Sequence, residues 1–316
     1  MSGRIAVLMP GQGSQFVGMG WDLAEAYPEV RRLYERADEI LGVPMSEICW
    51  EGPEERLRRT ENAQPAILTH SYAVWSVLPA EVRTSVVVAA GHSLGEFSAY
   101  LAADSLDFED ALRVVRRRGE LMADSGDERP GGMAAIMGLD PAAVEELCAS
   151  VEEGTVVPAN YNAPGQIVIS GDAEAVARVQ DLAAEAGSRV IPLNVSGAFH
   201  SPLMEVAREG LQEALESVEI RDPSFPVVAN VSAEAVTDSA TARENLVAQL
   251  TSPVRWVDGV GAMLAHEPDR WLEVGPGRVL AGLLRRIDRT QKGEAVGDPT
   301  AVEALQAKKS KMSGES

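Results

Sequence analysis

The chain has 316 residues, a length that allows about two compact units of ordinary size. It contains 48 Asp and Glu residues against 28 Lys and Arg residues, which gives a formal net charge of -20. Because a nucleic acid is a polyanion, this acidic balance argues against nucleic-acid binding. With 45% hydrophobic and 24% charged residues, the composition is that of a soluble folded protein and not of a disordered or membrane-spanning one.

The cysteines and the first residues bear on the cellular compartment. Cys49 and Cys148 lie far apart and form no C-x-x-C pair, so we expect two buried thiols and neither a zinc knuckle nor a disulfide framework. The apolar run 5–9 is too short for a signal peptide or a membrane span. We therefore expect a cytoplasmic protein that has no membrane partner.

The main body is predicted to have an α/β fold. The apolar run 5–9 predicts a buried strand that ends in a glycine-rich turn. A second run, 86–90, is followed by a tight turn and a helical stretch from 96 to about 103, and the same order recurs in 271–274 and 278–287. Strand, tight turn and helix form the unit of a parallel sheet, so we expect a mostly parallel sheet covered by helices.

A smaller unit is predicted between residues 129 and 196. Its pattern has the βαββαβ order of a ferredoxin-like subdomain. We expect 129–196 to be inserted into a discontinuous catalytic domain of 1–128 and 197–291, and 292–316 to be a mobile tail because its apolar pattern is weak. The predicted elements of the small unit are strands 133–138, 156–160, 166–170 and 189–195 and helices 141–151 and 173–186.

The turn after the second strand, Gly91-His92-Ser93-Leu94-Gly95, matches the G-x-S-x-G nucleophile elbow. In such an elbow small residues allow a sharp turn that lifts the serine hydroxyl above the sheet and aims a helix N-terminus at it. A strand-to-helix turn with an incidental serine is the alternative. Both flanks have the predicted strand and helix, and this favours Ser93 as a nucleophile.

A nucleophilic serine needs a base, and the chain has four histidines. His92 lies within the turn, while His70 and His266 lie in helical stretches where packing or surface roles are the simplest. His200 precedes Ser201-Pro202, the pattern of a helix start. Because a helix N-terminus disfavours a protonated imidazole, His200 is the predicted base; the alternative is a histidine that merely begins a helix.

Arg118 is a candidate binding residue at the edge of the apolar face of a predicted helix, 107–124. A guanidinium in this position usually has a carboxylate to bind. That carboxylate could belong to a substrate or to an internal salt bridge, and the pattern alone leaves both interpretations open.

No nucleotide, cofactor or metal site is predicted. The glycine-rich turn after the first strand has Phe16 where a dinucleotide fingerprint needs its third glycine, and no Lys-Ser or Lys-Thr pair follows it. No pair of histidines and carboxylates has metal-ligand spacing. We expect chemistry that uses protein side chains alone.

Seven motifs lie in order between Arg4 and Ile287 and together resemble one family. They are residues 10–15 (PGQGSQ), 64–66 (QPA), 91–96 (GHSLGE), 118–119 (RG), 160–165 (NYNAPG), 197–201 (GAFHS) and 273–277 (EVGPG). In this order and spacing they resemble the malonyl-CoA:acyl carrier protein transacylase family, the acyltransferases of type II fatty acid synthesis. The resemblance implies an α/β-hydrolase-like core with an inserted ferredoxin-like subdomain, the architecture that the residue patterns also predict.

The resemblance implies a role for each residue of a catalytic centre. Ser93 would be the nucleophile, and His200 would be its general base and acid. The side chain of Gln12 and the N–H of Leu94 would form the oxyanion hole.

Three further residues would shape the substrate site. Arg118 would bind the free carboxylate of the malonyl group, and Gln249 would orient His200 through its main-chain carbonyl. The ring of Phe199 would crowd an α-methyl group and so favour malonyl over methylmalonyl. The family's usual Asn-Pro-Val reads Ser252-Pro253-Val254 in this chain, a departure that we expect to leave the mechanism unchanged.

The implied activity is transfer of malonyl from malonyl-CoA to the phosphopantetheine thiol of an acyl carrier protein, without a cofactor and by a monomer. A free-standing acyltransferase of a polyketide pathway has the same chemistry and stays open. An α/β-hydrolase esterase is less favoured because no HGGG-type loop is present. A relic that only docks carrier proteins should have lost Ser93, His200 or Arg118, and all three are present.

Both implied substrates are anionic, as is the chain, so net charge cannot guide docking. We expect a locally positive surface instead. Two arginine clusters are candidates for it: Arg113, Arg116 and Arg117 on the outer face of the Arg118 helix, and Arg285, Arg286 and Arg289.

Overall fold

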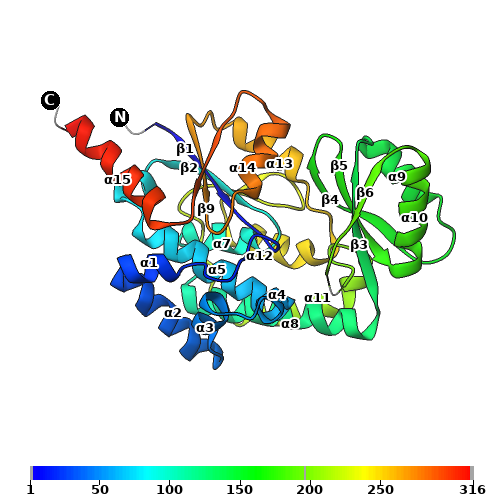
Figure 1. Cartoon of the computed structure of the whole chain (residues 1–316), viewed down its shortest axis with the longest axis horizontal. Coiled ribbons are helices and arrows are strands. Elements are labelled where there is room, and N and C mark those ends of the chain that lie inside the picture. The colour runs from blue at the N-terminus through cyan, green and yellow to red at the C-terminus, as the bar shows by residue number, and fades with distance from the viewer. Residues whose placement is uncertain (1–2, 196, 314–316) are drawn as a thin grey trace.

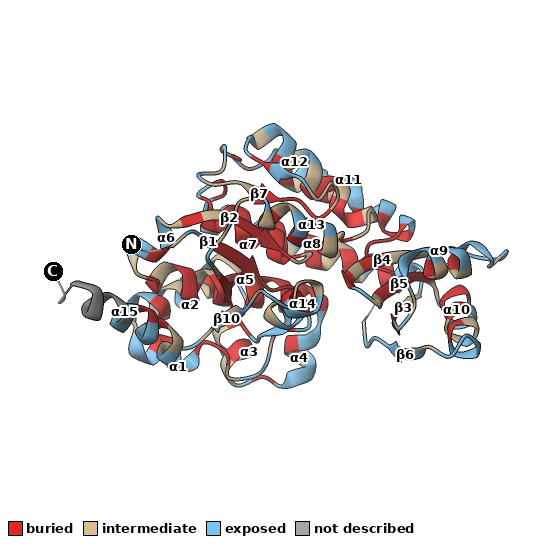
Figure 2. Cartoon of the chain, turned by 90° about the horizontal axis from the view of Figure 1, so that it is seen from above, coloured by how far each residue is buried: buried red, intermediate tan, exposed pale blue. Residues whose placement is uncertain are grey.

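In a computed structural model, which describes residues 3–195 and 197–313, the chain forms two separate β-sheets surrounded by helices (Figure 1). The larger, six-stranded sheet lies within the main body. The four-stranded sheet, drawn in green, lies to one side of that body, and the view from above shows the same separation (Figure 2). Ser196, at the predicted domain boundary, and residues 314–316 of the predicted tail lie outside the described residues.

The large sheet has the strand order β10-β9-β1-β2-β7-β8. Its neighbours pair in parallel except β7 and β8, which are antiparallel. The predicted α/β fold with a mostly parallel sheet is therefore confirmed. The strands are β1 Ile5–Met9, β2 Val86–Gly91, β7 Val227–Val228, β8 Ala235–Val236, β9 Arg270–Val274 and β10 Gly293–Val296.

Helices cover both faces of the large sheet. Within the described residues, those of the main body are α1 Trp21–Ala26, α2 Pro28–Leu41, α3 Met45–Trp50, α4 Glu54–Arg58, α5 Thr60–Val77, α6 Ala80–Arg83, α7 Gly95–Ala102, α8 Phe108–Glu128, α11 Glu205–Glu216, α12 Ser239–Ala248, α13 Trp256–Leu264, α14 Val279–Ile287 and α15 Pro299–Ser313, with the short 3-10 helices η1 Pro202–Met204 and η2 Gln249–Thr251.

Strand β1 shows why an uninterrupted apolar run forms the centre of this sheet. All five of its side chains are buried. Ile5, Val7 and Met9 belong to the core that contains α5, α7 and α8, whereas Ala6 and Leu8 belong to the core that contains α13 and α14. Successive side chains of a strand point to opposite faces, so a strand covered on both faces must be apolar at every position.

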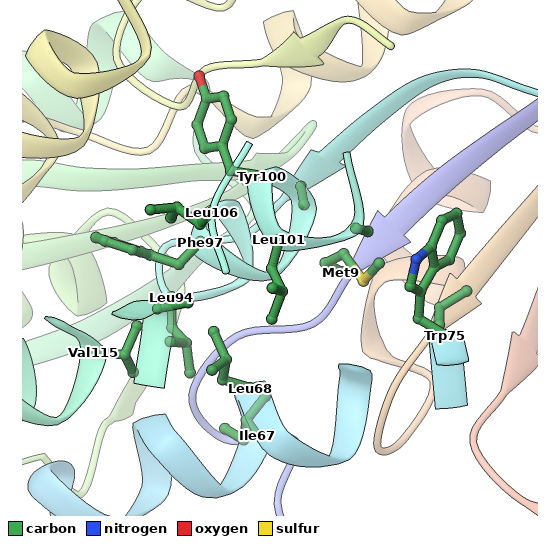
Figure 3. Packing of buried hydrophobic residues seen from close by; sticks show 14 of the residues in the cluster. Met9, Ile67, Leu68, Trp75, Leu94, Phe97, Tyr100, Leu101, Leu106 and Val115 are labelled. Atoms are coloured by element: carbon green, nitrogen blue, oxygen red, sulfur yellow. The ribbon is translucent and has the colours of Figure 1, made fainter. Parts of the chain in front are cut away.

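Helix α7, which follows the Ser93 turn, is the most enclosed helix around the site. All of its residues are buried. Leu101 points toward Leu68 of α5, while Phe97 lies near Leu94 and Leu106 (Figure 3), and all of them belong to the main core together with Val115 of α8. Burial of a large apolar side chain is worth about 1.5–3 kcal/mol, so this packing holds the start of α7 firmly against the sheet.

The small sheet is formed by the segment between α8 and η1. Its elements are β3 Gly131–Met137, α9 Pro141–Ala149, β4 Val156–Ala163, β5 Gln166–Asp172, α10 Ala173–Glu185 and β6 Arg189–Pro192, in the order βαββαβ. The strand order is β4-β5-β3-β6, and all three pairings are antiparallel. This sheet has a hydrophobic core of its own, to which Ile136, Val144, Ile169 and Val179 belong.

The segment beyond Lys292 differs from the prediction. Residues 293–296 form β10, which pairs in parallel with β9 at the edge of the large sheet. Val302 and Leu305 of the following α15 are buried in the main core. Residues 293–305 thus pair and pack against the main body, which the prediction of a mobile tail did not anticipate. Two buried side chains make too weak a pattern to be recognised, because the strand and helix are stabilised by contacts distant in sequence.

Candidate active site

The Ser93 turn joins the end of β2 to the start of α7, as predicted. Ser93 has a φ of 51°, in the left-handed region that a residue with a side chain rarely adopts. A Cβ added at Gly91 would lie 1.8 Å from the main-chain carbon of Gly95, and a Cβ at Gly95 would lie 2.1 Å from the carbonyl oxygen of Met9. The turn is so tight that both flanking positions require glycine.

His200 lies beside the serine hydroxyl. Its Nε2 is 2.7 Å from Ser93 Oγ, and its Nδ1 is 2.9 Å from the carbonyl oxygen of Gln249 and 3.2 Å from that of Ser252. Because a carbonyl can only accept, Nδ1 carries the proton and Nε2 is left to accept from the Ser93 hydroxyl. This tautomer is the one that a general base for Ser93 needs.

Burial keeps the His200 ring neutral. Desolvation, together with the positive charge of Arg118, lowers the pKa of His200 to about 3, although the hydrogen bonds of Nδ1 act in the opposite direction. Ser201 accepts a hydrogen bond from Leu203 N as the predicted N-cap, but the helix begins as the short η1 before α11. The predicted neutral imidazole therefore results mainly from desolvation and not from a helix N-terminus.

The guanidinium of Arg118 lies against the nucleophile. It is 1% exposed, and its Nη2 donates to Ser93 Oγ at 3.1 Å and to Gln249 Oε1 at 2.9 Å. Its Nη1 donates to Gln64 Oε1 at 2.7 Å, and the ring of Phe97 lies 5.6 Å away. No described carboxylate forms an ion pair with Arg118, so the alternative of an internal salt bridge is not seen in the described part of the chain.

Arg118 keeps its charge in spite of this burial. Desolvation lowers its pKa to about 10, which still leaves it protonated at neutral pH. A buried cation that only neutral acceptors contact is costly unless an anion joins it. Next to the Ser93 hydroxyl, it provides a binding position for an anionic group of a molecule that reacts with Ser93.

A cavity of about 440 Å³ opens above Ser93 and His200. Residues of the main body and of the small sheet line it, among them Met122 of α8 and Met133 of β3. Phe199 also lines this cavity, next to His200. The site therefore lies between the main body and the small sheet, where a ligand can contact both.

The two predicted oxyanion-hole groups lie at this cavity or beside it. Gln12 lines the cavity, and its Nε2 donates to Thr60 Oγ1 at 3.3 Å. Leu94 is the N-cap residue of α7, where backbone N–H groups have no intrahelical partner. Ser93, His200, Arg118, Gln12, Leu94, Gln249 and Phe199 are thus all brought to one place by the fold.

Asn230 belongs to this site but was not recognised in the sequence. Its side-chain oxygen accepts from Ser93 N at 2.7 Å, and its Nδ2 donates to the carbonyl oxygen of Gly91 at 2.7 Å. Asn230 thereby links the main chain of Gly91 and that of Ser93 within the turn. Asn230 lies at the end of β7, far from the turn in sequence, and no local motif marks it.

Glu96 and Gln64 also contact the site. Both lie in motifs that contribute to the family resemblance, but neither was assigned a role. Gln64 accepts from Arg118, and Glu96 Oε2 accepts from Gln249 Nε2 at 2.7 Å and from Asn230 N at 3.0 Å. Their positions in the motifs were the signal that could have drawn attention to them.

None of the other three histidines, all of which are described, hydrogen-bonds to the Ser93 hydroxyl. His92 Nε2 is 2.8 Å from Asn162 Oδ1, and burial lowers the pKa of His92. His70 is buried between the hydroxyl of Tyr34 at 3.2 Å and the carbonyl oxygen of Gly297 at 3.1 Å. The carbonyl of His266 accepts from the side chain of Arg4.

The described residues offer neither a metal-binding group nor a membrane-spanning helix. Within residues 3–195 and 197–313, no three His, Cys, Asp or Glu side chains are grouped so that they could hold a metal ion. In the same part of the chain, no helix combines the length and the apolar character needed to cross a membrane.

Known proteins share the sequence and the structure of this chain. A family described as the acyl transferase domain matches residues 7–307. The malonyl CoA-acyl carrier protein transacylase of Bacillus subtilis is 46% identical over 303 residues, which are 95% of this chain and 95% of that protein. The corresponding transacylase of Escherichia coli K12 is 41% identical and covers 95% of this chain and 98% of its own.

Solved structures agree with these relatives. The crystal structure of an acyl carrier protein S-malonyltransferase from Vibrio cholerae has a TM-score of 0.90 and 41% identity, and covers 96% of this chain and 99% of that one. A malonyl-transacylase in complex with its type II PKS acyl-carrier protein has a TM-score of 0.91 and 40% identity, with coverages of 96% and 98%. The chain therefore belongs to the acyl transferase family.

Proposed function

We propose that this chain is an [acyl-carrier-protein] S-malonyltransferase, which transfers the malonyl group of malonyl-CoA to the phosphopantetheine thiol of an acyl carrier protein. The observation that carries the proposal is the buried guanidinium of Arg118, 3.1 Å from Ser93 Oγ. A nucleophile next to a cation that no described carboxylate contacts directly suits an acyl group that ends in a carboxylate. The names of relatives that match almost the whole chain support the same substrates.

The first half-reaction acylates Ser93. Ser93 Oγ attacks the thioester carbonyl of malonyl-CoA while His200 Nε2 takes the hydroxyl proton. The tetrahedral intermediate collapses, the C–S bond breaks, and His200 returns its proton to the leaving CoA sulfur. A malonyl ester on Ser93 and free CoA result.

The negative oxygen of the tetrahedral intermediate needs hydrogen-bond donors. We assign this role to the N–H of Leu94 at the start of α7 and to the side-chain amide of Gln12. To donate, Gln12 turns its Nε2 from Thr60 toward the reacting carbonyl. One donor of this kind is typically worth about 10²–10³ in rate.

Recognition of the acyl group follows from two residues. Arg118 binds the malonyl carboxylate in place of its contact with Ser93 Oγ. An acetyl group would leave the buried guanidinium unpaired, a cost of about 1–3 kcal/mol or more. Phe199, buried at the cavity wall, leaves little room for an α-methyl substituent and so disfavours methylmalonyl.

The second half-reaction reverses the first with a different thiol. The phosphopantetheine thiol of the carrier gives its proton to His200 and attacks the ester on Ser93. The C–O bond then breaks, and the Ser93 oxygen regains the proton from His200. The two half-reactions form a ping-pong sequence in which Ser93 and His200 are restored and no cofactor takes part.

The two sheets suggest a division of the chain into a catalytic domain and an inserted subdomain. We propose an α/β-hydrolase-like catalytic domain formed by residues 1–128 and 197–291, with residues 129–196 as an inserted ferredoxin-like subdomain. The βαββαβ order and the separate core of the small sheet support this division. The cavity between the two parts gives the phosphopantetheine arm a wall on each side.

Compartment and assembly are part of the proposal. The thiols of Cys49 and Cys148 are free and buried, which suits a reducing cytoplasm. We propose that the protein acts there as a monomer, because every proposed catalytic residue comes from one chain. Light scattering coupled to size exclusion measures this, and a stable dimer would contradict it.

A transfer assay tests the proposed function. Malonyl-CoA is mixed with the enzyme with and without a phosphopantetheinylated carrier, and malonyl-carrier and free CoA are measured. We expect CoA release in step with malonyl-carrier formation and only slow release without the carrier. Equal CoA release in both reactions would show a hydrolase instead.

The choice of carrier tests the pathway. We propose that the chain supplies fatty acid biosynthesis, so a carrier of a fatty acid synthase should have the higher kcat/KM. A higher kcat/KM for a polyketide carrier would assign the enzyme to that pathway, the alternative with the same chemistry.

A further inference from the structure

Glu96 is a buried carboxylate that the proposed mechanism leaves without a role. It is 0% exposed and lies on α7, one turn after Ser93. Its Oε2 accepts from Gln249 Nε2 at 2.7 Å and from Asn230 N at 3.0 Å. Its Oε1 has no hydrogen-bond partner among the described residues. A carboxylate is costly in such a place, which directs attention to what its two partners do.

Gln249 connects all three predicted catalytic groups. Its Oε1 accepts from Arg118 Nη2 at 2.9 Å, its Nε2 donates to the carbonyl oxygen of Ser93 at 3.0 Å, and its main-chain oxygen faces His200 Nδ1 at 2.9 Å. The main-chain contact could be made by any residue type. The side-chain contacts need an amide whose oxygen faces Arg118 and whose nitrogen faces Ser93.

Glu96 fixes that orientation of the amide. An ionised carboxylate only accepts hydrogen bonds, so it requires the NH₂ end of Gln249 and directs the oxygen toward Arg118. Through Asn230 it also acts on the turn, because Asn230 Oδ1 accepts from Ser93 N at 2.7 Å. One carboxylate thus constrains the partners of both the nucleophile and the guanidinium.

We propose that Glu96 is a positioning residue for malonyl transfer: it holds Gln249 and Asn230 so that Arg118 and Ser93 keep the geometry needed for a malonyl group. The inference rests on the proposed function and deepens it. It assigns to Glu96 an effect on acyl selectivity that a residue needed only for packing would not have.

The charge of Glu96 varies near neutral pH. Burial raises its pKa to about 7, while the hydrogen bonds from Gln249 and Asn230 and the charge of Arg118 act in the opposite direction. The other titratable group coupled to it is Tyr100 of α7, whose pKa burial raises far above neutrality. The pKa values of Arg118 and His200, at about 10 and about 3, lie outside this range. Above pH 7 the ionised carboxylate of Glu96 accepts a charge-assisted hydrogen bond from Gln249 and fixes its amide group. Below pH 7 the protonated Glu96 holds this amide group less firmly.

The test is the rate of Ser93 acylation, measured by rapid quench with malonyl-CoA and with acetyl-CoA between pH 6 and pH 9. No carrier thiol titrates in this half-reaction. In the unaltered enzyme we expect the malonylation rate to fall as the pH drops through about 7. Glu96→Gln keeps the acceptor oxygen but not the charge, so we expect a malonylation rate about 10-fold lower at pH 8 and nearly independent of pH, as for loss of one charge-assisted hydrogen bond.

Selectivity and a matched control separate positioning from packing. Acetylation should fall less than malonylation in Glu96→Gln, because an acetyl group does not use Arg118. The control is Glu273→Gln, which alters another fully buried glutamate, one that accepts from Leu280 N and Ala281 N at the start of α14. It should keep the pH profile and the malonyl-to-acetyl ratio of the unaltered enzyme.

Two results would overturn the inference. One is a Glu96→Gln enzyme with an unchanged malonylation rate and pH profile, and the other is an equal loss of malonylation and acetylation. Circular dichroism confirms folding of each variant, and Glu96→Asp, which keeps the charge, should recover more of the malonylation rate than Glu96→Ala. Failure of the unaltered enzyme to be malonylated would instead overturn the proposed function, and this inference with it.

Discussion

The hydrogen bonds of Arg118 explain why the site contains several neutral polar side chains. Arg118 is surrounded by the oxygens of Gln64, Gln249 and Ser93, none of which neutralises it. The guanidinium is therefore fixed in place yet still able to bind an anion. An aspartate in place of Gln249 would occupy the cation permanently.

This arrangement predicts the effect of removing the guanidinium. In Arg118→Ala, kcat/KM for malonyl-CoA should fall about 10²-fold, because the malonyl carboxylate loses a charged partner in a buried pocket. Transfer of acetyl should be retained or increased. Steady-state kinetics with both thioesters measure the two values.

Arg117→Ala is the matched control for that substitution. Arg117 lies on the same helix, is 49% exposed and, among the described side chains, forms an ion pair only with Glu120, at 4.0 Å. Its loss should leave both activities unchanged. Equal losses for malonyl and acetyl in Arg118→Ala would assign Arg118 a structural role.

At the scale of elements, the turn between β2 and α7 could be predicted best from the sequence. A β-branched run, two glycines around a serine and a following helix are all local features, and a tight turn depends on local geometry. The same holds for Ser201 and Pro202 at the start of η1. The positions of Ser93 and His200 within elements could therefore be anticipated, whereas their 2.7 Å approach depends on the fold.

Features that depend on distant contacts could not be anticipated. Asn230 acts on the turn from the end of β7, and no spacing in the sequence connects the two. Strand β10 exists because β9 offers it an unpaired edge, and α15 because the core receives two of its side chains. Weak local patterns do not reveal such contacts.

The ordered C-terminal segment leads to a prediction about stability. Leu305 of α15 is 6% exposed in the main core, and Leu305→Ala should lower the free energy of unfolding by about 2 kcal/mol through lost burial and a residual cavity. Glu303→Ala on the exposed side of the same helix should change it by less than about 0.5 kcal/mol. Urea denaturation measures both. Equal unfolding midpoints for Leu305→Ala and the unaltered protein would show that α15 does not contribute to the core.

At the scale of the whole molecule, the acidic surface restricts where an anionic carrier can dock. Arg113, Arg116 and Arg117 are all paired with acidic side chains of their own helix, at 3.4 Å, 2.7 Å and 4.0 Å, so the first predicted cluster has little free charge. Arg285, Arg286 and Arg289 form no ion pair within the described residues. This second cluster stays the predicted docking surface, and the carrier KM in the transfer assay, with these arginines altered, measures it.

The main body and the small sheet together form the cavity in which the proposed nucleophile of this acidic molecule lies. Ser93 lines the cavity between the main body and the small sheet, and the buried guanidinium of Arg118 lies 3.1 Å from its hydroxyl oxygen. We therefore expect an anionic acyl group to be drawn to Ser93 itself. A malonyl group should therefore become bonded to Ser93.

The most direct test is the intact mass of the protein after mixing with malonyl-CoA, followed by mapping of the modified peptide. We predict that one malonyl group is added, and that it is carried by Ser93. Ser98→Ala, which removes another buried serine of α7, should still accept the group, whereas Ser93→Ala should accept none. A malonyl adduct that persists in Ser93→Ala, or its absence from the unaltered protein under conditions of active transfer, would contradict the account.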